Sequence, residues 1–209
     1  MICVSIANIS FEQLLIEISH FKMMELRLDL LNYTPDQYLS LIDYNIPIIA
    51  TYRGKTIDKE KKKILDQLIS KQVQYIDFDV DELDNDREQI LESARQNKTS
   101  VVLSSHVFNR MPDRVQIERL KQYKESRFAD IIKLACKAQN QSDIKTIQTW
   151  YKEINPLVAF SMGEYAQSTR LDCLSWGAPW TYAAFDEQSS TAQGQFPFKI
   201  MQTILNERK

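Results

Sequence analysis

The chain has 209 residues, of which 44% are hydrophobic, so it is long enough to bury a sizeable core. Its formal net charge of -2 gives no electrostatic basis for binding nucleic acid or an anionic membrane. It has 4 glycines and no GxGxxG or P-loop pattern, which argues against a glycine-rich nucleotide-binding loop.

Short apolar runs alternate with longer amphipathic stretches along the whole chain. The predicted strands are 2–7, 23–30, 47–53, 75–80, 100–108, 130–136, 157–162 and 180–185. The predicted helices are 10–21, one that opens at Thr34-Pro35, 58–72, 84–97, 113–125, 141–154, 166–174 and 197–207.

This strict alternation implies a parallel sheet with right-handed crossovers. Eight strand–helix units predict a closed (β/α)8 TIM barrel with short loops. No linker or low-complexity tract divides residues 1–209, so we expect a single barrel domain. An open doubly wound sheet is the alternative.

Three widely spaced cysteines, Cys3, Cys136 and Cys173, form no CxxC pair and suit reduced thiols in a cytosol. The first residues lack the basic and long apolar segments of a signal peptide. No apolar run approaches the ~18 residues of a membrane-spanning helix. We therefore expect a soluble, cytoplasmic protein.

Several predicted strands carry polar residues on one face only. Side chains alternate along a strand, so Glu25 and Arg27 share a face, as do Asp77 and Asp79. Parallel strands covered by helices are normally apolar on both faces. A barrel whose lumen is charged at the C-terminal ends of the strands explains the pattern better, and Lys133 is expected inside that lumen.

Lys133 stands alone in one apolar strand, and His106 ends another. Burial lowers the pKa of a lysine and frees its amine to attack a carbonyl. The protonated imine acidifies the adjacent carbon, and a histidine can take that proton and protonate a leaving hydroxyl. Arg27, Arg53 and Arg170 suit a carboxylated substrate. The structural alternatives are a strand-end lysine that reaches water and a hydrogen-bonded core histidine.

A series of short motifs, one on most strands, follows in a specific order and spacing. These motifs are Glu25-Leu26-Arg27-Leu28-Asp29, Thr51-Tyr52-Arg53, Tyr75-Ile76-Asp77, Ser104-Ser105-His106-Val107-Phe108, Ile132-Lys133-Leu134-Ala135, Ser161-Met162-Gly163, Ser168-Thr169-Arg170 and Gly194-Gln195. Together they resemble type I 3-dehydroquinate dehydratase, the Schiff-base dehydratase of the shikimate pathway.

The resemblance implies that 3-dehydroquinate loses water to give 3-dehydroshikimate, without a metal or organic cofactor. It implies that Lys133 forms the imine, that His106 is the general acid and base, and that Asp77 orients His106. The residues that it assigns to substrate binding are Ser5, Glu25, Arg27, Arg53, Met162, Arg170 (for the carboxylate), Tyr182, Thr191 and Gln195. It also suggests a homodimer, although the composition is compatible with a monomer.

Two loops depart from the family pattern. Many members carry an acidic residue and two glycines after the third-strand arginine, where this chain has Gly54-Lys55-Thr56-Ile57-Asp58. A carboxylate near the histidine is therefore either missing or supplied by Asp58. The last loop is longer than usual and lacks a proline before Gly194. The hydroxyl that meets substrate there is either Ser190 or Thr191, and we expect Thr191.

Two other functions stay open. One is another lysine-imine barrel, such as an aldolase or transaldolase acting on a phosphorylated sugar, although no glycine-rich phosphate-binding loop follows the last two strands. The other is a non-catalytic ligand-binding barrel, which only the altered loop after Arg53 supports.

Overall fold

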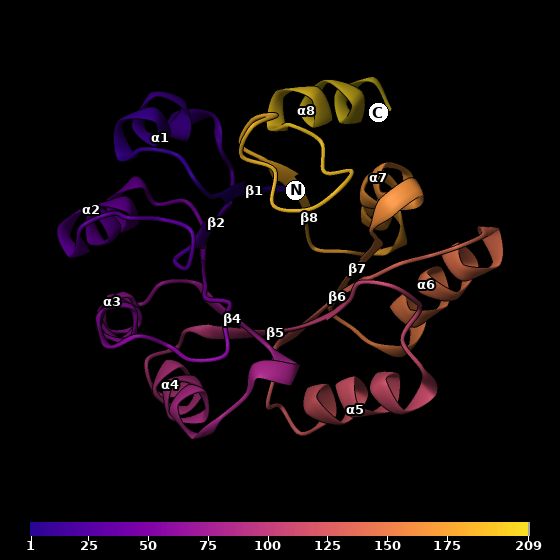
Figure 1. The fold of residues 1–209 in the computed structure, drawn as a ribbon, viewed down its shortest axis with the longest axis horizontal. Helices are drawn as coiled ribbons and strands as arrows, with labels where there is room; N and C mark the ends of the chain where they lie inside the picture. Colours follow the sequence, from indigo (N-terminus) through magenta and orange to yellow (C-terminus); the bar gives the residue numbers. More distant parts are fainter. Residues whose placement is uncertain (209) are drawn as a thin grey trace.

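The computed structural model describes residues 1–208 as an eight-stranded parallel sheet curled into a barrel, with helices outside it (Figure 1). The strands are β1 Ile2–Ile6, β2 Met24–Arg27, β3 Ile48–Thr51, β4 Tyr75–Asp79, β5 Ser100–Val107, β6 Ile131–Cys136, β7 Leu157–Ser161 and β8 Thr181–Ala184. The helices are α1 Phe11–Glu17, α2 Pro35–Ser40, α3 Lys59–Ser70, α4 Asn85–Gln96, α5 Arg114–Glu125, α6 Gln141–Glu153, α7 Ala166–Trp176 and α8 Phe198–Glu207. The predicted (β/α)8 barrel is confirmed, because the strand order runs in sequence from β1 to β7 with β8 beside β1.

Side-chain caps begin most helices close to the predicted positions. Ser10, Thr34 and Asp113 form capping boxes at α1, α2 and α5. Asp58 and Asp84 cap α3 and α4. Each cap accepts a backbone N–H that has no partner within the helix. Asp58 is thus engaged at the start of α3.

The second strand is shorter than predicted. It ends at Arg27 rather than at residue 30, because the chain turns there and the Leu30 N–H donates to the Arg27 carbonyl at 2.8 Å. This turn lies at the rim of the barrel, so it brings the end of β2 to the mouth of the lumen.

Alternation along the strands sends one set of apolar side chains outward and another inward. The larger core lies between the barrel wall and the helices. The smaller one lies in the lumen and is formed by Cys3, Met23, Ile49, Val102, Ile131, Ala135, Val158, Phe160, Trp180 and Tyr182. Lys133 lies between Ile131 and Ala135 on this inward face, as predicted.

The strand ladder is interrupted between β7 and β8, which do not pair in residues 1–208. Hydroxyls carried by two helices bond to β7 instead. Tyr151 of α6 donates to the Ala159 carbonyl and accepts from the Ala159 N–H, each at 2.6 Å. Thr169 of α7 accepts from the Ser161 N–H at 2.9 Å. The edge of β7 is therefore hydrogen-bonded to helix side chains at Ala159 and Ser161, although β8 does not pair with it.

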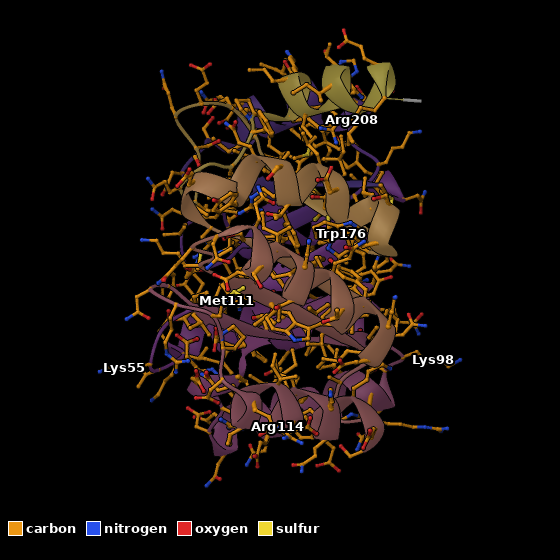
Figure 2. All side chains as sticks on the ribbon, turned by 90° about the vertical axis from the view of Figure 1, so that its right-hand side faces the viewer. Lys55, Lys98, Met111, Arg114, Trp176 and Arg208 are labelled. Atoms are coloured by element: carbon orange, nitrogen blue, oxygen red, sulfur yellow. The ribbon has the colours of Figure 1, made fainter. Side chains whose placement is uncertain are left out.

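The two ends of the barrel are visible from the side in Figure 2. Lys55, which follows β3, marks the end where the strands finish, and Lys98, which precedes β5, marks the opposite end. The charged side chains predicted for the lumen belong to the first of these ends. Among residues 1–208, no helix is long and apolar enough to cross a membrane.

Candidate active site

A cavity of about 450 Å³ opens at the C-terminal ends of the strands. This is the end at which barrel enzymes place their catalytic groups. The predicted site residues that line it are Glu25, Arg27, Arg53, His106, Lys133, Met162, Arg170, Tyr182, Thr191 and Gln195. Ser5 and Asp77 lie behind this lining, where both are buried.

Lys133 lies in the lumen with its ammonium paired on two sides. Its Nζ is 2.9 Å from Glu25 Oε1 and 3.2 Å from Asp77 Oδ2. The same Nζ lies 4.1 Å from the centre of the Tyr182 ring, a distance at which a cation is attracted to an aromatic face. Since the residue is only 6% exposed, the alternative of a strand-end lysine reaching water is excluded.

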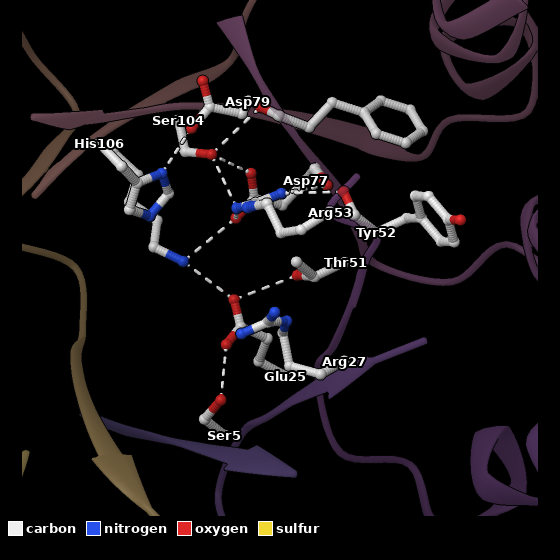
Figure 3. A network of polar contacts seen from close by, with 12 residues as sticks. Ser5, Glu25, Arg27, Thr51, Tyr52, Arg53, Asp77, Asp79, Ser104 and His106 are labelled. Carbon is white, nitrogen blue, oxygen red and sulfur yellow. Dashed lines mark hydrogen bonds and ion pairs between the residues drawn. The ribbon is translucent and has the colours of Figure 1, made fainter. Parts of the chain in front are cut away.

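Glu25 is the carboxylate on one side of Lys133. It accepts hydrogen bonds from the hydroxyls of Ser5 at 2.8 Å and Thr51 at 3.1 Å (Figure 3). Burial alone would raise its pKa, but the charges of Lys133, Arg27 and Arg53 hold the pKa at about 2. The site therefore keeps a fixed negative charge beside the lysine at neutral pH. Ser5 acts on the cavity only through this carboxylate.

Asp77 is the carboxylate on the other side, and Arg53 and Ser104 hold it in place (Figure 3). Arg53 Nη2 lies 2.7 Å from Asp77 Oδ2, and the Ser104 hydroxyl donates to Asp77 Oδ1 at 2.7 Å. Arg53 also donates to the Ser104 hydroxyl at 2.7 Å. Asp77 is thus bonded on both oxygens, and neither oxygen contacts the histidine.

His106 contacts Asp79, and our expectation that Asp77 orients it is wrong. His106 Nδ1 lies 2.5 Å from Asp79 Oδ2 (Figure 3). The physical reason is strand register: Asp79 of β4 is level with Ser104 of β5, whereas Asp77 lies further toward the start of the strands. Burial lowers the pKa of His106, the charges of Arg53 and Lys133 lower it further, and the bond to Asp79 opposes them. The imidazole is therefore neutral at pH 7.

Arg170 reaches the cavity from α7 without an acidic partner. Its guanidinium lies 3.9 Å from the centre of the Phe160 ring. No salt bridge joins it to an acidic side chain of residues 1–208, and its buried Nε has no hydrogen-bond partner. Burial lowers the pKa of Arg170 to about 10. An unpaired cation buried beside a cavity has the chemistry to bind an anion.

The rim of the cavity is formed by β2 and by the loop before α8. Arg27 makes a two-point ion pair with Asp29, at 3.0 and 2.6 Å. In the loop, the Thr191 hydroxyl donates to Gln195 Oε1 at 3.2 Å, and both residues line the cavity. The Ser190 hydroxyl instead donates to the Ala192 carbonyl. Thr191 therefore lines the cavity and Ser190 does not, and the contact of the Thr191 hydroxyl with substrate stays a prediction.

Three residues that contact His106 or Arg170 were not among the site residues predicted from the sequence. Asp79 shares a strand face with Asp77, and that alternation was the available signal. Phe108 stacks on His106 with ring centres 6.0 Å apart, and Phe160 lies under Arg170. No sequence signal separated these two phenylalanines from ordinary core residues. In residues 1–208, no group of three or more His, Cys, Asp and Glu could hold a metal ion.

Comparisons with known proteins agree over nearly the whole chain. Residues 2–209 match the family described as type I 3-dehydroquinase. A relative from Syntrophobacter fumaroxidans, named 3-dehydroquinate dehydratase, is 30% identical over 171 residues, covering 76% of this chain and 71% of the relative. Another of that name, from Methanococcus vannielii, is 27% identical and covers 99% of both chains.

Solved structures show the same fold. A type I 3-dehydroquinate dehydratase from Clostridium difficile, with covalently modified comenic acid, has a TM-score of 0.80 and 24% identity, covering 99% of this chain and 91% of that one. The 3-dehydroquinate dehydratase from Aquifex aeolicus has a TM-score of 0.82 and 18% identity, covering 99% and 98%.

Proposed function

Because the chain belongs to the type I 3-dehydroquinase family, a family of hydro-lyases, we propose that it removes water from 3-dehydroquinate through an imine on Lys133. The observation that carries this proposal is the position of Lys133. Its amine is buried in the lumen between two carboxylates and lines a cavity that also holds a neutral histidine and an unpaired arginine.

The reaction begins at the amine of Lys133. Attack on the substrate ketone joins the lysine nitrogen to the carbonyl carbon, and two hydrogens of the Lys133 ammonium leave with the ketone oxygen as water. The protonated imine that forms draws electrons from the adjacent carbon. His106 removes a proton from that carbon and then protonates the hydroxyl that leaves from the next carbon. Hydrolysis of the imine returns the lysine and consumes one water, which balances the water released when the imine formed. The net change is the loss of one water from the substrate.

Glu25 and Asp77 stabilise the positive charge of both the ammonium and the imine. One oxygen of each carboxylate already lies within 3.2 Å of the lysine nitrogen. They are fixed in place by the hydroxyls of Ser5, Thr51 and Ser104, so little reorganisation is needed as charge moves onto the imine.

The remaining lining residues bind the substrate. Arg170 suits the substrate carboxylate, because its guanidinium is desolvated and unpaired. Glu25, Arg27 and Arg53 suit the ring hydroxyls. The residues that form the walls and the covering loop are Met162, Tyr182, Thr191 and Gln195. We further propose, on family resemblance alone, a cytoplasmic homodimer, for which light scattering after gel filtration is the test.

Trapping the imine tests the proposal. Intact-mass spectra after mixing with 3-dehydroquinate and borohydride should show a single adduct that maps to Lys133. Lys133→Ala should show none, whereas Lys137→Ala, which removes a neighbouring lysine one residue past the end of β6, should still form it. An adduct in Lys133→Ala would refute the imine assignment.

The role of His106 needs a separate measurement. His106→Ala should still form the trapped adduct but should turn over about 10²- to 10⁴-fold more slowly, because general acid–base catalysis contributes about that much. Near-normal turnover would remove His106 from this role. If the wild-type protein forms no adduct, cleavage of ketose phosphates tests the aldolase alternative, and binding of 3-dehydroquinate without turnover would indicate a ligand-binding barrel.

A further inference from the structure

The contact between Asp79 and His106 bears on which nitrogen of the imidazole can act as a base. We propose that Asp79 is a positioning residue that holds His106 in the tautomer with hydrogen on Nδ1, so that the lone pair of Nε2 serves the substrate. The kinetic consequences of this inference rest on the proposed function. The tautomer of His106 does not depend on the identity of the substrate.

The carboxylate of Asp79 is held from two sides. At the end of β4, its Oδ1 accepts the backbone N–H of Asp81 at 3.0 Å, which leaves Oδ2 for His106. Burial raises the pKa of Asp79, but the contact with His106, the N–H of Asp81 and the charge of Arg53 together hold the pKa below its usual value. An ionised carboxylate can only accept hydrogen bonds, so the hydrogen between the two groups belongs to Nδ1.

No other carboxylate is placed to do this. Among residues 1–208, Asp79 is the only acidic side chain in hydrogen-bond or ion-pair contact with His106. Asp77 is occupied by Arg53 and Ser104, and Asp58 caps α3. The carboxylate therefore comes from a strand end, and the altered loop after β3 does not need to supply it.

The plane of the imidazole is also restricted. The Phe108 ring stacks on it at an interplanar angle of 18°. With Nδ1 held by Asp79 and one face covered by Phe108, rotation of His106 away from this orientation would cost both contacts. The charged groups that act on His106 are Asp79 on β4, Arg53 after β3 and Lys133 on β6.

Two consequences follow for catalysis. Asp79 stabilises the imidazolium that forms when His106 takes a proton, as a carboxylate does in hydrolase triads. The bond to Asp79 also raises the pKa of His106 against the lowering by burial, Arg53 and Lys133. Removing Asp79 should therefore slow proton transfer and move the acid limb of the pH–rate profile to lower pH.

The tautomer can be observed directly in the wild-type protein. The chain has only 2 histidines, so ¹⁵N-histidine labelling gives few imidazole signals, and His20→Asn identifies those of His106. We expect Nδ1 of the free enzyme at neutral pH to show the chemical shift of a protonated nitrogen and Nε2 that of an unprotonated one. The reverse pattern would overturn the inference, whatever the enzyme's substrate.

Variants then test the consequence. Asp79→Asn should keep the borohydride adduct on Lys133 but lose about 10²- to 10⁴-fold in kcat, because the amide can hold the wrong tautomer. Asp79→Glu, which keeps a carboxylate, should retain more activity than Asp79→Asn. In Asp79→Ala, the acid limb of kcat/KM should move to lower pH.

Asp86→Asn is the matched control. It removes the same charge from a largely exposed side chain of α4 that pairs with Lys62 and does not line the cavity. We expect its kcat and pH profile to be unchanged. If Asp79→Asn behaves like Asp86→Asn while wild-type protein traps substrate, the positioning role is wrong and the proposed function stands. If wild-type protein neither traps nor turns over substrate, the proposed function fails and the tautomer measurement still decides the geometry.

Discussion

Replacing Arg170 by methionine should stabilise the folded protein. The guanidinium is 2% exposed and has no acidic partner in residues 1–208. Methionine has nearly the same length and can fill the same space against Phe160 without a charge. The residue that we propose binds the substrate carboxylate therefore destabilises the protein while that anion is absent.

The lowered pKa of Arg170 sets the magnitude. A guanidinium whose pKa falls from 12.5 to about 10 on folding carries about 3 kcal/mol of unfavourable free energy at every pH below the folded value. The penalty decreases only as the pH rises above about 10. Allowing for imperfect repacking, we expect Arg170→Met to gain about 1–3 kcal/mol at pH 7. For a chain of this size, that gain raises Tm by roughly 3–10 °C.

Thermal and urea unfolding at pH 7 measure the gain. Arg87→Met is the matched control, because Arg87 is also fully buried but donates to the carbonyls of Gly54 and Lys55 and pairs with Asp84. Arg87→Met should destabilise, since it leaves those groups unpaired. Adding 3-dehydroshikimate should raise Tm of the wild type much more than that of Arg170→Met. Equal destabilisation by the two substitutions would refute the reasoning.

Three further predictions concern stability. The pKa of Glu25 is about 2 in the folded protein and 4.5 ordinarily, so its contribution of about 3 kcal/mol is complete above pH 4.5 and is lost as the pH falls toward 2. The urea midpoints of Glu25→Gln should lack this dependence on pH. Tyr151→Phe should cost about 2–4 kcal/mol, because it leaves the N–H and carbonyl of Ala159 unpaired. Tyr182→Phe should be neutral or stabilising, since that buried hydroxyl has no partner of normal geometry; similar losses for both tyrosines would contradict this.

Alternation along strands predicted which side chains enter the lumen, because it depends only on the two-residue period of a strand. Glu25, Asp77 and Lys133 all lie there, and their order along the chain assigned each to a different strand. The sequence therefore predicted the barrel and most of the cavity lining.

The height of each residue in the barrel could not be predicted in the same way. Asp77 and Asp79 share a face, so alternation alone does not say which of them lies nearer to His106. The register between β4 and β5 decides it, and that register results from packing of the whole barrel. Ser5 was expected in the cavity from the resemblance, whereas it does not line the cavity and its hydroxyl donates to Glu25.

Because β7 and β8 do not pair within residues 1–208, the barrel is an open sheet in topological terms, and these two strands are its edges. Exposed edges invite pairing with strands of other chains, and natural proteins protect them. Here the N–H and carbonyl of Ala159 and the N–H of Ser161 are already bonded to hydroxyls from α6 and α7. The edge of β7 thus cannot template aggregation at these positions, although β8 does not cover it.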